Sequence, residues 1–249
     1  MTYYHVTRRP KTAAAFRGRI ALLLAALLLL VASSTVAAAA VGVDEIFANS
    51  QAVMDKAKTM SLNMAMTQVA PDKSEMKIRA TILGDRGLGI YRITMLEPAA
   101  MADQVIVIDT KAKKMRMYMP VSNQIIVRSL DEGGAGAAPG GMGFDFSRLS
   151  QLPSQKDYDI KLTSVQKTSS GDVYVLSVTA KKKGAQGGIS TGTQKVWIRS
   201  DDWMVSKVEL YDDKGQLQGT ILLQDLKLNP KLTKTQLTQL PKDAQVVEQ

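Results

Sequence analysis

The chain has 249 residues, with 32 lysines and arginines, 23 acidic residues, one histidine and no cysteine. This length is enough for one large domain with its own core. The absence of cysteine excludes disulfides, thiolate nucleophiles and zinc fingers. The single histidine, His5, lies in the segment that we interpret below as a cleavable leader, so the mature chain also lacks histidine catalysis and histidine-ligated metals.

Residues 1–40 have the pattern of a secretory signal peptide. Five basic residues precede an apolar run from Ile20 to Ala32, and Ala38-Ala39-Ala40 offers a cleavage site. The run is shorter than the roughly 20 apolar residues of a membrane span, although an uncleaved anchor is the alternative. We therefore expect a periplasmic protein whose domain occupies residues 41–249.

Removal of the leader leaves 27 basic and 23 acidic residues, a net charge of +4. The basicity of the full chain is thus mostly a property of the leader. The remaining basic run, Lys181-Lys182-Lys183, is typical of a solvated hairpin tip. No basic stripe with interleaved aromatic residues is present, so we expect no nucleic-acid partner.

After the leader, residues 44–58 place apolar side chains at helical spacing and predict an amphipathic helix. From there the hydrophobic period changes to two, which indicates strands with one wet and one dry face. Short turns such as Lys214-Gly215 and Ser170-Gly171 favour antiparallel pairing. We predict about eleven strands, near residues 61–69, 74–83, 88–97, 104–110, 113–119, 122–130, 158–167, 172–182, 192–200, 203–212 and 216–228. Together they predict a mainly β fold, one curved antiparallel sheet that forms an incomplete, open barrel.

The one long break between strands is residues 131–156, which contain a glycine-rich tract at 133–143. The tract lacks the lysine and the strand and helix context of a phosphate-binding loop. It is either a disordered surface insertion or a hinged lid, whose apolar underside would come from Phe144 and Phe146.

Methionine is unusually frequent, with twelve residues after the leader. Met64 and Met66, and likewise Met115, Met117 and Met119, are spaced by two and therefore share a strand face. Flexible thioethers fill cores, line adaptable apolar cavities or bind Cu(I). For a cavity, the candidate lining residues are Met64, Met66, Met76, Ile78, Ile82, Tyr91, Ile93, Met95, Met115, Met117, Met119, Leu176 and Val178.

No arrangement of residues in the sequence indicates catalysis. The pairs Asp201-Asp202 and Asp212-Asp213 fall in turns, where aspartate is favoured for local hydrogen bonding. We therefore expect neither enzymatic activity nor a cofactor.

Several segments resemble the LolA/LolB-like family of periplasmic lipoprotein carriers and outer-membrane lipoprotein-sorting proteins. The resemblance extends along nearly the whole mature chain and is most specific in the C-terminal third. The matching segments are Lys195-Val196-Trp197-Ile198, Val208-Glu209-Leu210, Asp213-Lys214-Gly215-Gln216, Leu228-Asn229-Pro230, the tail from Leu240-Pro241 to Val247, Met117-Tyr118-Met119-Pro120 and Gly143-Phe144-Asp145-Phe146-Ser147.

The resemblance implies an incomplete barrel whose mouth is closed by helices and whose interior holds acyl chains. It also implies that Arg86, near the family's strand-ending arginine, holds the lid closed by hydrogen bonds. The expected function is a soluble carrier, a monomer that shields acyl chains of lipoproteins or lipids between an inner-membrane donor and an outer-membrane acceptor. The alternative is a non-catalytic envelope sensor or scaffold that binds a lipid or a partner protein.

Overall fold

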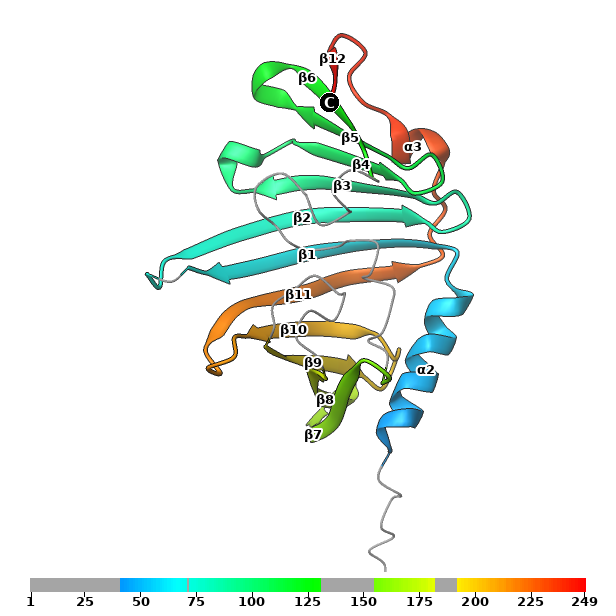
Figure 1. The fold of residues 1–249 in the computed structure, drawn as a ribbon. Coiled ribbons are helices and arrows are strands. Elements are labelled where there is room, and N and C mark those ends of the chain that lie inside the picture. The colour runs from blue at the N-terminus through cyan, green and yellow to red at the C-terminus, as the bar shows by residue number, and fades with distance from the viewer. Residues whose placement is uncertain (1–40, 71, 131–154, 182–191) are drawn as a thin grey trace, which may run out of the picture. The chain divides into compact units, whose positions relative to one another are not determined.

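The computed structural model describes residues 41–70, 72–130, 155–181 and 192–249 (Figure 1). The predicted leader and the glycine-rich tract, with Phe144 and Phe146, lie outside the described residues, as do Lys182 and Lys183. The leader and the lid therefore stay predictions. Residues 42–249 form one unit, which is described here.

The first described element is α2 (Val43–Lys56), which confirms the helix predicted at residues 44–58. Its buried side chains are Ile46, Ser50 and Met54, spaced by four so that they form one stripe. Acidic residues occupy the first turn and Lys56 the last, which matches the helix dipole.

Twelve strands follow, and together they make a single curved sheet that is not closed into a barrel, which confirms the predicted fold class (Figure 1). Eleven of them correspond to the predicted strands. The twelfth, β12, was not predicted. The strands are β1 (Thr59–Val69), β2 (Glu75–Asp85), β3 (Ile90–Glu97), β4 (Val105–Asp109), β5 (Lys114–Met119), β6 (Gln124–Ser129), β7 (Tyr158–Thr168), β8 (Gly171–Ala180), β9 (Thr193–Arg199), β10 (Val205–Tyr211), β11 (Leu217–Leu228) and β12 (Gln245–Glu248).

The strand order in the sheet is β12-β6-β5-β4-β3-β2-β1-β11-β10-β9-β8-β7. Neighbours pair in antiparallel fashion, as predicted, except that β12 lies parallel to β6. The pairing of β1 with β11 joins an N-terminal half-sheet to a C-terminal one. β6 and β7 are consecutive in sequence but belong to opposite ends of this order.

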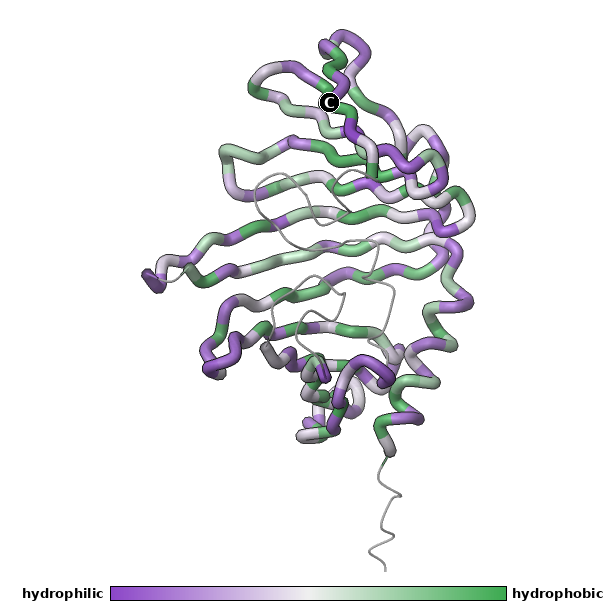
Figure 2. The backbone as a smooth tube through the Cα atoms, viewed as in Figure 1, coloured by the Kyte–Doolittle hydropathy of each residue, from purple (hydrophilic) through white to green (hydrophobic). Residues whose placement is uncertain are grey.

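Apolar and polar residues alternate along the long strands, as Figure 2 shows. On β1 the even-numbered residues from Met60 to Met66 are buried and the residues between them are half-buried. This period of two is the reason why the segment forms a strand with one apolar side.

The C-terminal segment covers part of the other side of the sheet. Helix α3 (Lys234–Thr238) begins with a capping box, in which Thr233 and Gln236 satisfy each other's backbone N–H groups. Its Leu237 is fully buried in a small cluster with Ile90, Val105 and Val107. β4 is therefore buried on both faces, which explains its unbroken apolar run Val105-Ile106-Val107-Ile108.

Two short 3-10 helices interrupt the first half-sheet. They are η1 (Ala99–Met101), between β3 and β4, and η2 (Pro120–Ser122), between β5 and β6.

Candidate ligand-binding face

One side of the sheet carries a continuous set of buried apolar side chains, which we call the apolar face. Val53 and Met54 of α2 pack against it, and so does Met101 of η1. The buried members of this cluster are Met54, Met60, Leu62, Met64, Met66, Ile78, Ala80, Ile82, Ile93, Met95, Ile106, Ile108, Met115, Met117, Met204, Leu210, Ile221 and Leu223.

Strand register shows that the apolar face continues from strand to strand. Directly paired residues of adjacent antiparallel strands lie on the same side of a sheet. One row of such pairs crosses the first half-sheet, and another crosses the second half-sheet into β1 and β2. The first row is Leu62, Ile82, Ile93, Ile106, Met117 and Ile126, and the second is Leu176, Val196, Val208, Ile221, Met66 and Ile78.

The predicted lining residues share this side of the sheet. Most belong to the buried cluster, and Tyr91 and Met119 pack against it. Leu176 and Val178 of β8 are each 1% exposed, and Leu176 extends the second row. Met76 is 40% exposed because it lies near the turn at the start of β2. The structure thus places these residues together, and their role as a lining stays a prediction.

Methionines supply a large share of the apolar face. Met64 and Met66 alternate on β1, and Met115 and Met117 on β5, all buried. A thioether side chain has three rotatable bonds and packs against surfaces of varied shape. A face built from such side chains can adapt to chains of different length and branching.

Arg86 fastens one end of α2 to the sheet. Its Nη1 donates to the carbonyl oxygen of Met54 at 2.5 Å, and its backbone N–H donates to the Lys58 carbonyl at 2.9 Å. A cation at a helix C-terminus is favourable because the last carbonyls lack helical partners. The family resemblance implies that this arginine holds a lid closed by hydrogen bonds. Arg86 makes such a hydrogen bond here, and its partner is α2.

Tyr91 closes the same end of the apolar face. Its ring lies directly over Gly84, where a Cβ would come within 2.8 Å of the ring carbon Cδ1. Burial raises the pKa of the Tyr91 hydroxyl, an effect that the charge of Arg86 opposes and that of Asp85 reinforces. Tyr91 therefore stays neutral beside Arg86 at physiological pH.

Gln104 is a polar residue of the apolar face that the sequence analysis did not identify. It precedes β4 and is 4% exposed. Its Nε2 donates to the Sδ atoms of Met117 and Met119, at 3.1 and 2.8 Å. The signal that could have found it is one uncharged polar residue directly before an unbroken apolar strand.

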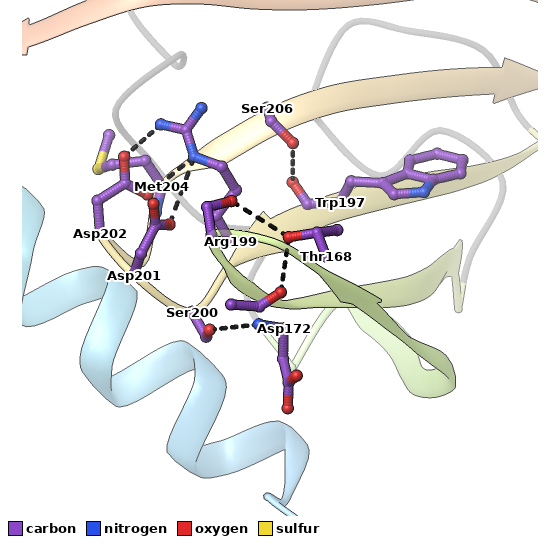
Figure 3. Close-up of polar contacts among 11 residues, drawn as sticks. Thr168, Asp172, Trp197, Arg199, Ser200, Asp201, Asp202, Met204 and Ser206 are labelled. Atoms are coloured by element: carbon purple, nitrogen blue, oxygen red, sulfur yellow. Dashed lines mark hydrogen bonds and ion pairs between the residues drawn. The ribbon is translucent and has the colours of Figure 1, made fainter.

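The carboxylates near the β9–β10 turn are used by the turn itself (Figure 3). Arg199 binds Asp202 through both Nε and Nη2, and Asp202 accepts the Met204 backbone N–H at 3.1 Å. The hydrogen bond to Asp202 is the main reason why the pKa of Arg199 is raised. This arrangement is that of a structural turn, as the sequence predicts for Asp201 and Asp202.

Within the part of the chain that the structure describes, no three His, Cys, Asp or Glu side chains come together as a metal site. No helix among these residues has the length and hydropathy needed to span a membrane.

The side of the sheet opposite the apolar face carries charges and aromatic rings on β9 and β10. Lys207 Nζ lies 4.4 Å from the centre of the Trp197 ring and 2.6 Å from Glu209 Oε1. Tyr211 donates to Glu209 Oε2 at 2.5 Å, and Lys195 lies over the Tyr211 ring at 5.1 Å. These half-buried groups satisfy one another.

Comparison with known proteins gives one family match. A family model with the description "Uncharacterized protein" matches residues 91–240, more than half of the chain. No curated protein matches the chain.

Among solved structures, an uncharacterized conserved protein from Thermus thermophilus has the same fold. It is 17% identical, with a TM-score of 0.55 over 83% of this chain and 98% of that one. The LolA superfamily protein NE2245 from Nitrosomonas europaea also matches, at 20% identity and a TM-score of 0.39 over 80% and 99% of the two chains. A putative outer membrane lipoprotein-sorting protein domain from Vibrio parahaemolyticus matches at 18% identity and a TM-score of 0.43, over 78% and 94%.

Proposed function

We propose that this chain, which belongs to the LolA-like family, holds the acyl chains of lipoproteins or lipids against its apolar face and carries them between envelope membranes. The signal peptide predicted at residues 1–40 supports a periplasmic location for this function.

The observation that carries the proposal is the pair of apolar rows on one side of an open sheet. Rows of paired side chains such as Leu62, Ile82 and Ile93 make a surface many strands wide. An open sheet of this extent has a broader apolar side than a closed and filled small barrel. Because most of its side chains are already buried, an extended hydrocarbon chain would bind by replacing the contacts that cover them.

Hydrophobic burial supplies the energy that such binding requires. Each CH₂ group taken from water contributes about 0.8 kcal/mol, so a chain of about 16 carbons gains on the order of 10 kcal/mol when it is fully buried. This same free energy prevents an acyl chain from crossing an aqueous compartment alone. A protein surface that replaces the bilayer is sufficient for transfer, and no chemical step is needed.

The contact of Arg86 with α2 supports a role for that helix in controlling access. One hydrogen bond from an exposed arginine to the Met54 carbonyl closes a helix end that packs on the apolar face. A single hydrogen bond from a charged donor contributes about 1.5 to 3 kcal/mol, which is small enough for the contact to break and form again reversibly. We propose that Arg86 stabilises the closed position of α2.

The proposal is tested with protein purified from the periplasm of an expression host. Solvent extraction followed by mass spectrometry should release acyl lipid or lipopeptide, and the emptied protein should bind a fluorescent acyl probe. Met117→Glu places a carboxylate in the first row and should reduce probe binding sharply. Met117→Leu conserves apolar volume and should keep it.

Val121→Glu is the control, because it introduces the same carboxylate at a side chain that is 92% exposed. It should leave probe binding close to that of the parent. A parent protein that contains no lipid and binds no acyl probe would overturn the carrier proposal and favour the sensor or scaffold. Equal loss of binding in both glutamate variants would place the acyl site elsewhere.

A further inference from the structure

Gln104 leaves one polar atom without a partner inside the apolar face. Its side chain is 96% buried, and its Nε2 is occupied by the Sδ atoms of Met117 and Met119. Its backbone N–H donates to the Met101 carbonyl, and its own carbonyl accepts from Met95. Among the described residues Gln104 Oε1 is the buried side-chain oxygen that no donor reaches.

The orientation of the amide follows from the chemistry of its neighbours. A thioether sulfur accepts hydrogen bonds and has no hydrogen to donate. The two sulfurs therefore face the NH₂ group of the amide, and the amide oxygen has no hydrogen-bond donor. Turning the amide over would place an acceptor against two acceptors and would leave two N–H donors unpaired.

A buried carbonyl without a donor is unfavourable, and methionine or leucine would fill this position without that penalty. Met117 and Met119, whose sulfurs contact the amide, are flexible and apolar side chains. An acceptor in such surroundings can select among acyl ligands, because it binds those that bring a donor and stays unpaired with those that do not.

We propose that Gln104 Oε1 accepts a hydrogen bond from a donor at the polar end of the acyl ligand, so that the protein prefers acyl chains joined through a secondary amide over those joined through an ester. This inference rests on the proposed function, since it assigns a specificity residue to the same apolar face. Amide-linked chains of an N-acylated polypeptide and of a small N-acyl lipid share this chemistry.

The test uses two fluorescent probes that have the same acyl chain and differ only in an amide or an ester linkage. Both linkages have a carbonyl acceptor, and only the amide has a donor. The parent should bind the amide probe about threefold to thirtyfold more tightly than the ester probe, the range expected for one buried hydrogen bond.

Gln104→Met removes the acceptor and keeps the volume, so it should bring the ratio of the two affinities close to one, mainly by weakening amide binding. Gln124→Met is the matched control, because the Gln124 amide already donates to Gln245 Oε1, at 3.4 Å. It should keep the ratio of the parent. An N-palmitoyl peptide and an N-acyl amine used as competitors distinguish the two sources of the amide.

A parent that binds both probes equally would overturn the inference and leave the carrier proposal intact. A parent that binds neither probe would overturn the proposed function itself. The ratio measured on the parent needs no variant, so the inference can be tested even if Gln104→Met fails to fold.

Discussion

Ile221 and Leu222 are neighbours on β11, but their side chains lie on opposite sides of the sheet. Ile221 is 1% exposed in the row that runs from Leu176 to Ile78, whereas Leu222 is 36% exposed. On the side of Leu222, the directly paired residue on β10 is Lys207, which contacts Trp197 and Glu209. One strand thus presents an isoleucine to the apolar face and a leucine beside paired polar groups to the other side.

This difference shows why the two sides are suited to different tasks. The polar side satisfies its charges by local pairs, such as that of Lys207 and Glu209, whose side chains are 33% and 16% exposed. The apolar side is stabilised by the exclusion of water. An acyl chain that binds there would add to the buried apolar surface.

The largest expected effect comes from placing the same charge on each side. Ile221→Asp leaves an unpaired carboxylate in the apolar face and should reduce the free energy of unfolding by about 4 kcal/mol. Leu222→Asp places the carboxylate next to Lys207 at the surface and should change it by less than about 1 kcal/mol. Urea unfolding of the two variants measures the difference, and similar losses in both would contradict the assignment of sides.

A smaller loss is expected where α3 covers the side opposite the apolar face. Leu237→Ala removes a fully buried side chain between α3 and β4 and should cost about 3 kcal/mol. Acyl binding by the folded variant should be unchanged, because Leu237 does not belong to the apolar face. Thr235→Ala, at an exposed position of the same helix, is the control, and a loss of acyl binding in the Leu237 variant alone would link the two sides.

The same covering helix can be weakened at its first turn. Thr233→Ala removes the capping box and should reduce stability by about 1 kcal/mol. Thermal unfolding measures this effect, and Thr233→Ser should largely restore it. No change in the alanine variant would mean that α3 is held by Leu237 without its cap.

The smallest effect is a titration on the polar side. The hydrogen bond to Glu209, together with burial and the charge of Glu209, raises the pKa of Tyr211 to about 12. Because the folded pKa is higher than the ordinary value of 10.0, the stabilisation is present below pH 10 and is lost as pH rises through about 12. The difference in tyrosinate absorbance between the parent and Tyr211→Phe reports this titration.

Glu209→Gln should move the Tyr211 titration back toward its ordinary range. Burial alone would raise the pKa of Glu209, but hydrogen bonds from Lys207 and Tyr211 and the charges of Lys207 and Lys195 lower it. Its stabilisation is therefore present above the ordinary carboxyl range and lost as pH falls through the lowered value. A Tyr211 titration that the substitution leaves unchanged would show that burial, and not Glu209, sets it.

The sequence pattern predicts the strands because alternation is a local signal. The residues around Met64 and Met117 repeat every two positions, which is enough to assign both the strand and the face. β12 has only four residues, and its parallel partner β6 lies about 120 positions earlier, so no local period indicates it. Thr233 and Gln236 do form a readable capping signal for α3, although the helix is only five residues long.

The partners of Gln104 could not be predicted for a related reason. Its sulfur partners follow it by 13 and 15 residues and reach it only through the register of β4 on β5. Met76 was predicted as a lining residue from its spacing alone. It lies on the expected side of β2, but its place at the start of the strand leaves it exposed. Period assigns a face, but the position along the strand decides burial.

The most direct test of the central claim is to map where an acyl chain lies. A fatty-acyl probe with a photoreactive group on its chain would be bound, irradiated and located by peptide mass spectrometry. We predict labels on alternate residues of one side, such as Met64 and Met66 on β1 and Met115 and Met117 on β5. Labels on Trp197, Lys207 or Leu222, or no saturable labelling at all, would contradict the account.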